Sequence, residues 1–192
     1  MIANTHSVPR RLAARLASFL GGRSRSLALL LCLIAQAPAQ ALDAPPTVSN
    51  LDLQRYLGTW YEIAAYPQSF QRGCVASRAD YSLRSDGTLD VLNRCRKERL
   101  DGEWKEARGN ARVVGPGKLK VSFFWPFEGD YWVLALDADY RWVLVGGPNY
   151  DYLWILSRTP QLDAATYSAI TTRAAALGYP LSPLQKTLQA KD

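Results

Sequence analysis

The chain has 192 residues, of which 48% are hydrophobic and 21% charged, and its formal net charge is +6. Five arginines and no carboxylate fall within residues 1–41, so the rest of the chain carries a formal charge of only +1. That balance excludes the basic stripe that a nucleic-acid backbone would need. About 150 residues remain after this segment, a length that suits one domain with one hydrophobic core.

Residues 1–41 are predicted to be a secretory signal peptide that is cleaved. An arginine-rich segment precedes the apolar run Leu27–Ala35, which is too short to span a bilayer. Small residues at Ala39 and Ala41 predict cleavage after Ala41, and cleavage after Ala39 remains the alternative. The mature protein is therefore expected to be periplasmic or secreted.

The only histidine, His6, lies in this leader, so the mature chain has none. Without an imidazole there is no Ser-His-Asp or Cys-His pair, no histidine-ligated zinc and no histidine acid or base. Catalysis would have to rest on carboxylates, lysine, tyrosine or cysteine. We predict a protein that is not an enzyme and that needs no cofactor or metal.

The first elements after the leader are read from local composition. Residues 42–49 contain Pro45-Pro46 and are predicted to form an extended lead-in to a domain at residues 50–192. A first strand is predicted at Gly58–Ala64, because aromatic and β-branched residues suit a half-buried sheet. The Asp86-Gly87 step then predicts a hairpin whose charged residues face water. This alternation turns inward the side chains of Ala79, Tyr81, Val91 and Asn93.

Five more strands complete the predicted sheet. They cover Trp104–Val114, Lys118–Phe123, Tyr131–Leu136, Trp142–Gly146 and Tyr152–Ser157. The last three are almost continuously apolar, as expected of strands that are covered on both faces. A helix predicted from Asp163 to about Leu177 supplies the outer cover, and a short strand near Leu184–Leu188 returns to the first strand.

Many short strands followed by one helix predict an all-β fold. We expect an eight-stranded antiparallel up-and-down β-barrel with one C-terminal α-helix, at about residues 163–177, packed outside. The interior of such a barrel either fills with side chains or holds one small molecule, and both arrangements remain open. The predicted cavity residues are Glu62, Ala79, Tyr81, Val91, Asn93, Val121, Phe123, Trp132, Leu134, Tyr152 and Trp154.

Glu62 is the polar exception among these predicted cavity residues. A carboxylate on an inward face is costly to bury without a partner. It could pair with a lysine or arginine, lie in a wet cavity, or form a hydrogen bond with the head group of a ligand.

Three blocks along the chain resemble the signature of the lipocalin family. They are Gly58-Thr59-Trp60-Tyr61, Asp139-Tyr140, and the segment Leu153–Pro160 with its Arg158. The similarity extends from about Asn50 to Gln189 and is strongest to the bacterial lipocalins, a group that resembles apolipoprotein D.

The resemblance implies structural roles for five residues. Trp60 is expected to stack against Arg158 and to close one end of the barrel. Gly58, Asp139 and Tyr140 are expected to support this closure. The loop after the first strand is expected to lie across the open mouth.

The resemblance also implies a function, namely binding and transport or storage of a fatty acid or a lysophospholipid. Relatives of this kind are associated with the cell envelope and with membrane maintenance or stress, so association with the outer membrane is an expectation. Lipid anchoring at Cys32 is not expected, because Leu31 precedes it where family members that carry a lipid have a small residue.

Cys74 and Cys95 are the two cysteines of the mature chain, and export favours a disulfide between them. A regular hairpin would set Cys95 opposite Ser77, about 10 Å along the strand from Cys74, so the bridge requires a bulge or a folded-back segment before Val75. In the alternative, Cys95 is the nucleophile of a thiol-dependent lipid-modifying enzyme, as in the lipocalin-type prostaglandin synthase.

A third hypothesis is a non-catalytic interaction module that acts through the mouth loops. Phe124, Trp125 and Phe127 form an aromatic loop that is expected to be exposed near the mouth. The same loop could make peripheral contact with a membrane. The sequence does not indicate an oligomeric state.

Overall fold

Strand β1 (Gly58–Ala65) is the strand at which the sheet closes into a barrel. It pairs in antiparallel fashion with β2 (Cys74–Leu83) on one side and with β8 (Leu153–Ser157) on the other. The computed structural model describes residues 43–190, so the leader, its cleavage site and Cys32 lie outside the described residues. Between residues 43 and 190, every helix is too short or too polar to serve as a membrane span.

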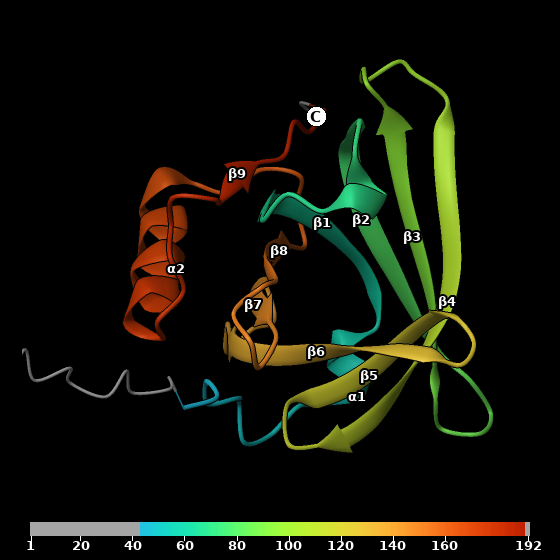
Figure 1. Cartoon of the computed structure of the whole chain (residues 1–192), viewed down its shortest axis with the longest axis vertical. Helices are drawn as coiled ribbons and strands as arrows, with labels where there is room; N and C mark the ends of the chain where they lie inside the picture. Colours follow the sequence, from blue (N-terminus) through green and yellow to red (C-terminus); the bar gives the residue numbers. More distant parts are fainter. Residues whose placement is uncertain (1–42, 191–192) are drawn as a thin grey trace, which may run out of the picture. The chain divides into compact units, whose positions relative to one another are not determined.

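The remaining barrel strands follow one another in sequence order, each paired with its neighbour (Figure 1). They are β3 (Leu89–Lys97), β4 (Trp104–Gly115), β5 (Lys118–Phe124), β6 (Phe127–Leu136) and β7 (Trp142–Gly146). The predicted eight-stranded antiparallel barrel is thus confirmed. The largest difference in a boundary is in β6, which begins at Phe127, before its predicted start at Tyr131.

Helix α2 (Ala164–Ala176) packs on the outside of the barrel, as predicted. Asp163 caps it, because its carboxylate accepts a hydrogen bond from the backbone N–H of Thr166 at 2.9 Å. Ile170 and Ala174 are buried against the outward side chains of β7 and β8. Figure 1 shows α2 beside these strands, and this explains why both faces of the late strands are apolar.

The C-terminal tail completes the barrel wall between β1 and β2. The short strand β9 (Gln185–Lys186) pairs with the end of β1, as the sequence predicted. Beyond it, the side-chain amide of Gln189 donates to the backbone carbonyls of Glu62 and Ser77, each at 2.8 Å. Since β1 pairs with β2 only over residues 58–61, the tail fills the gap where the two strands diverge.

The side chains of β6 face the opposite way from the prediction. Tyr131 and Val133 belong to the core inside the barrel, whereas Trp132 and Leu134 lie in the outer core shared with α2. The cross-strand partner of Trp132 is Lys118, whose ammonium lies 4.1 Å from the centre of the indole. The prediction that Trp132 and Leu134 line the cavity is therefore wrong. A strand that is apolar on both faces shows no alternation from which its orientation can be inferred.

Candidate functional site

One end of the barrel is closed by Trp60 and Arg158. Trp60 is fully buried, and the guanidinium carbon of Arg158 lies 3.8 Å from the centre of its ring. Arg158 also donates to the backbone carbonyls of Thr59, Arg55 and Tyr140 at 2.9, 2.6 and 3.3 Å. The positive charge at this end is therefore stacked on an aromatic face and shared among three carbonyl groups.

Gly58, Tyr140 and Asp139 were also expected to support this closure. Gly58 has a φ of 90°, which favours glycine, and the hydroxyl of Tyr140 accepts the backbone N–H of Asp52 at 2.9 Å. Asp139 is exposed, and its backbone N–H donates to the carboxylate of Asp137 at 3.1 Å. The carboxylate that stabilises this turn thus belongs to Asp137.

Three tyrosines form a hydrogen-bonded floor inside the closed half of the barrel. The hydroxyl of Tyr131 lies 2.6 Å from that of Tyr56, the last residue of α1 (Leu53–Tyr56), and accepts a hydrogen bond from Tyr81 at 3.1 Å. Burial raises the pKa of all three phenols well above the ordinary value, so they remain neutral. Aromatic side chains therefore fill this half of the interior.

The open half of the barrel is different, because its inward side chains keep contact with solvent. Ala107 lies opposite Asn93, and their register turns both inward, yet Ala107 is exposed and Asn93 is partly exposed. Other inward side chains that are partly exposed are those of Ala79, Val121, Phe123 and Trp154. In a closed barrel, inward groups reach solvent through the lumen or the mouth, so this half is not filled by side chains.

Apart from Trp132 and Leu134, the predicted cavity residues face the interior or lie at the mouth. Tyr81 and Val91 belong to the packed closed half. Tyr152, just before β8, is 39% exposed at the mouth and stacks on Trp154 with 5.6 Å between the ring centres. Contact between these residues and a ligand remains a prediction.

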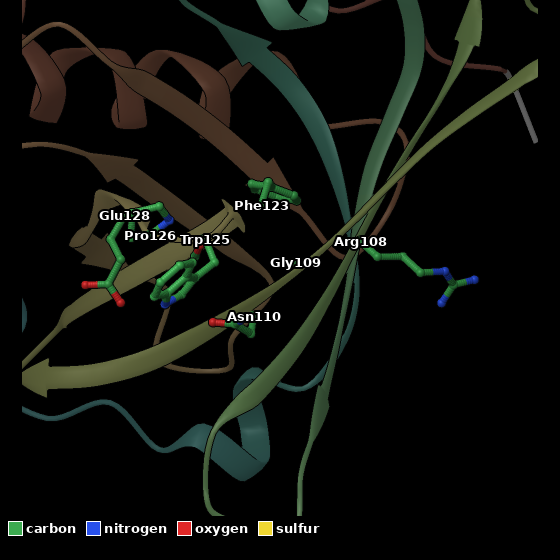
Figure 2. A pocket seen from close by; sticks show the side chains of 8 residues that line it. Arg108, Gly109, Asn110, Phe123, Trp125, Pro126 and Glu128 are labelled. Carbon is green, nitrogen blue, oxygen red and sulfur yellow. The ribbon is translucent and has the colours of Figure 1, made fainter.

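A small pocket of about 250 Å³ lies at the rim, beside the β5–β6 turn (Figure 2). Figure 2 shows Phe123 and Arg108 on opposite sides of β4. The ring of Phe123 covers Gly109, where a Cβ atom would lie 2.8 Å from Cδ1 of the phenylalanine. Gly109 thus lets the Phe123 ring lie directly on β4.

Glu62 lies beside a larger pocket of about 530 Å³ at the mouth, formed by the end of β1, η1 (Ser69–Gln71), the start of β2 and the C-terminal tail. Its carboxylate accepts hydrogen bonds from Nε2 of Gln71 at 2.7 Å and from the hydroxyl of Thr187 at 2.6 Å. Gln71 in turn accepts a hydrogen bond from the indole N–H of Trp154 at 3.3 Å. Burial raises the pKa of Glu62, and the hydrogen bonds from Thr187 and Gln71 partly oppose this shift.

The sequence pattern did not identify three residues of this region. Tyr131 was missed because the orientation of β6 was predicted wrongly. Gln71 and Thr187 belong to a loop and a tail, where there is no periodicity to show direction. The only available signal was that an inward Glu62 requires hydrogen-bond donors. Within residues 43–190, no group of three or more His, Cys, Asp or Glu side chains is placed to hold a metal ion.

Cys74 and Cys95 form a disulfide, with 5.4 Å between their Cα atoms. The pairing of β2 with β3 shifts between Val75 and Arg78, and Ala76 has a φ of 49° at this irregularity. The predicted bridge is confirmed, and of the two arrangements that could permit it, the bulge is the one that the strand pairing shows. A bridged Cys95 carries no thiolate, so the thiol-dependent enzyme hypothesis loses its nucleophile.

The aromatic loop between β5 and β6 is exposed, as predicted. The exposed fractions are 80% for Phe124, 91% for Trp125 and 76% for Phe127. In an up-and-down barrel this turn lies at the same end as the β1–β2 loop that contains η1. The loop therefore lies on the rim of the open half.

Comparison with known proteins agrees with this architecture. A family model described as "Lipocalin-like domain" matches residues 51–189. Outer membrane lipoprotein Blc of Escherichia coli (strain K12) is 44% identical over 166 residues, which cover 80% of this chain and 93% of that relative. Apolipoprotein D of Bos taurus is 38% identical over 134 residues, which cover 64% of this chain and 68% of the bovine protein.

A solved structure shows the same fold at lower sequence identity. Insecticyanin from the tobacco hornworm, Manduca sexta, superimposes with a TM-score of 0.62 at 20% identity, covering 78% of this chain and 86% of insecticyanin. The family model covers most of the chain, and the closed end contains the stacked pair of Trp60 and Arg158. The chain therefore belongs to the lipocalin family.

Proposed function

We propose that this protein binds and carries a small hydrophobic ligand, a fatty acid or a lysophospholipid, in the open half of its barrel, without catalysis and without a cofactor. One observation carries the proposal. The interior is sealed at one end by Trp60 and Arg158, while inward side chains such as Ala107 and Trp154 remain accessible at the other. A hollow with one closed end and apolar walls suits a single acyl chain.

The energetics agree with a ligand of this kind. Burying roughly 16 methylene groups at about 0.8 kcal/mol each contributes about 12 kcal/mol. Association costs of about 4–15 kcal/mol offset much of this gain. We therefore expect micromolar to nanomolar affinity from the acyl chain alone, and the head group then decides between ligands.

We propose a location in the cell envelope. Residues 1–41 are removed as a signal peptide, and the mature protein acts in the periplasm or outside the cell, at the surface of the outer membrane. A relative at 44% identity is named an outer membrane lipoprotein, which supports this location. Anchoring through Cys32 is not part of the proposal, because Leu31 precedes it. In this location a lipid carrier would serve membrane maintenance or the response to membrane stress.

The most direct test is native mass spectrometry of protein purified from its source, followed by lipid extraction and identification. We expect one bound lipid per barrel. A matched pair of variants on β4 then locates the site. Ala107→Trp fills the lumen and should abolish binding of a fluorescent fatty acid, whereas Arg108→Trp places the same ring outside and should not. Equal binding by both variants would contradict a ligand inside the barrel.

A second candidate function is peripheral contact with a membrane through the β5–β6 turn. Three aromatic side chains exposed at one turn favour it, since Trp and Phe partition into the interface of a bilayer. Replacing Trp125 and Phe127 by Ala should weaken sedimentation with phospholipid vesicles. Unchanged sedimentation would contradict membrane contact and would favour the alternative in which the loop binds a partner as an interaction module.

A further inference from the structure

Glu62 is an unusual group in this protein. Among residues 43–190, it is the only acidic or basic residue in the buried set, with 8% of its surface exposed. It takes part in none of the ion pairs formed within that part of the chain. An ionised carboxylate buried without a cation costs free energy, so its presence at the mouth requires a reason.

The groups around Glu62 are oriented toward a negative charge. The indole of Trp154 donates to Gln71, and Gln71 and Thr187 each donate to the carboxylate. These contacts occupy only part of the capacity of a carboxylate, which offers about four acceptor positions. The remaining positions are available to a donor in the adjoining pocket of about 530 Å³.

The charged groups near this pocket make their contacts elsewhere. The ammonium of Lys105, on the inward face of β4, donates to the backbone carbonyl of Phe70 at 3.0 Å. The ammonium of Lys186 lies 4.5 Å from the ring centre of Tyr167 on α2, which draws it out of the pocket. Arg72 lines the pocket but is exposed on the loop, where solvent and salt screen its charge. Two neighbouring carboxylates, those of Glu98 and Asp151, are also exposed.

We propose that Glu62 binds the ammonium group of a single-chain amphiphile at the mouth of the barrel. The protein then selects ligands with a cationic nitrogen in the head group over free carboxylates. This inference rests on the proposed function, because it assigns a head-group preference to the same lipid site. The chemical class is an acyl or alkyl chain that ends in, or carries close to its polar end, a primary or quaternary ammonium.

Charge explains the selectivity. An ammonium supplies the missing counter-ion to Glu62 and forms a charge-assisted contact in a region that is largely removed from water. A fatty-acid carboxylate at the same place meets a like charge, so one of the two groups must take up a proton before both can stay. A neutral head group meets neither effect and reports the contribution of the chain alone.

The test is competition against one fluorescent fatty acid by four probes that differ in head group. They are dodecyltrimethylammonium, lysophosphatidylcholine, monopalmitoylglycerol and palmitate. We expect Glu62→Gln to weaken the two ammonium probes about tenfold, to leave monopalmitoylglycerol unchanged and to strengthen palmitate. Glu98→Gln is the matched control for an exposed carboxylate at the rim, and it should keep the preference for ammonium.

The outcomes separate this inference from the proposed function. If all four probes displace the fluorophore with the same relative affinities in wild type and Glu62→Gln, the head-group inference is wrong and the carrier function stands. If no probe displaces it, the carrier function itself fails.

A pH series on the wild type gives an answer even if the variant does not fold. Dodecyltrimethylammonium does not titrate, and it should bind more tightly as pH rises and Glu62 ionises. A flat pH profile between pH 4 and 8 would contradict the inference.

Discussion

The two ends of the barrel treat a buried charge in opposite ways. At the closed end, Arg158 stacks on Trp60 and donates to three backbone carbonyls. At the mouth, Glu62 receives neutral donors from a loop and a tail and no cation from residues 43–190. The first arrangement is complete within the protein, and the second lacks a counter-ion. Substitutions at the closed end should therefore change stability, and substitutions at the mouth should change binding.

The largest loss of stability is expected for Trp60→Ala. It empties the closed end and removes the surface on which Arg158 stacks, so we expect the free energy of unfolding to fall by about 3–5 kcal/mol. Trp154→Ala at the mouth is the control of equal size and should cost clearly less, since Trp154 is partly exposed. Urea unfolding of both variants gives the measurement. Equal losses would show that the two ends do not differ.

The disulfide should have the next largest effect. Cys74→Ala with Cys95→Ala opens a link between residues 21 positions apart, so the free energy of unfolding should fall by about 3 kcal/mol. Guanidinium unfolding compares the variant with the oxidised wild type. A thiol titration of denatured, non-reduced protein purified from its source supplies the control, and two free thiols there would contradict the bridge.

The stability contributed by the two halves can also be compared by removing a single hydroxyl group from each. Tyr131→Phe removes the hydroxyl shared by Tyr56 and Tyr81 and should cost about 1–2 kcal/mol of stability. The same change at Tyr152, which is 39% exposed at the mouth, should be nearly neutral. Thermal unfolding of the two variants makes the comparison. A neutral Tyr131→Phe would mean that the floor does not contribute to the seal.

The stability of the protein should depend on pH through Glu62. Burial raises its pKa above the ordinary value of 4.5, so the native state keeps this proton to higher pH than the unfolded chain. Stability from this group is present below pH 4.5 and is lost as pH rises through the native pKa. Glu62→Gln cannot ionise, so the difference in Tm between variant and wild type should move in favour of the variant from pH 4 to pH 8. A difference that is constant with pH would contradict the shift.

The smallest effect on stability is expected at the aromatic rim. Trp125 is 91% exposed, so Trp125→Ala should change the free energy of unfolding by less than about 0.5 kcal/mol. Vesicle binding is the property that this substitution should change. A large loss of stability would show that Trp125 packs on the barrel in solution.

The barrel could be predicted from the sequence because its signals are local. The Asp86-Gly87 turn, the Asp163 cap and the strand alternation around Ala79 and Val91 each depend on neighbouring residues. The disulfide was also predictable, since export favours a bridge between the two cysteines that remain after the leader, although a regular hairpin register would have kept them apart.

The mouth could not be predicted in the same way. On β6 the helix covers one face and the lumen the other, so Trp132 and Tyr131 look equally suited to the interior. Gln71 and Thr187 reach Glu62 from segments that lie 9 and 125 residues away in the chain. No periodic pattern relates such positions, and only the folded chain brings them together.

The position of Gln189 has a practical consequence for anyone who handles this protein. Its side chain bridges β1 and β2, and its neighbour Leu188 accepts the backbone N–H of Ala76 at 2.7 Å. Affinity tags and fusion partners are often joined close to such a position on the assumption that a tail is a neutral attachment point. Here a trimmed or displaced tail would open the barrel wall between β1 and β2. A loss of ligand binding in a tagged sample would then reflect the tag and not the native protein.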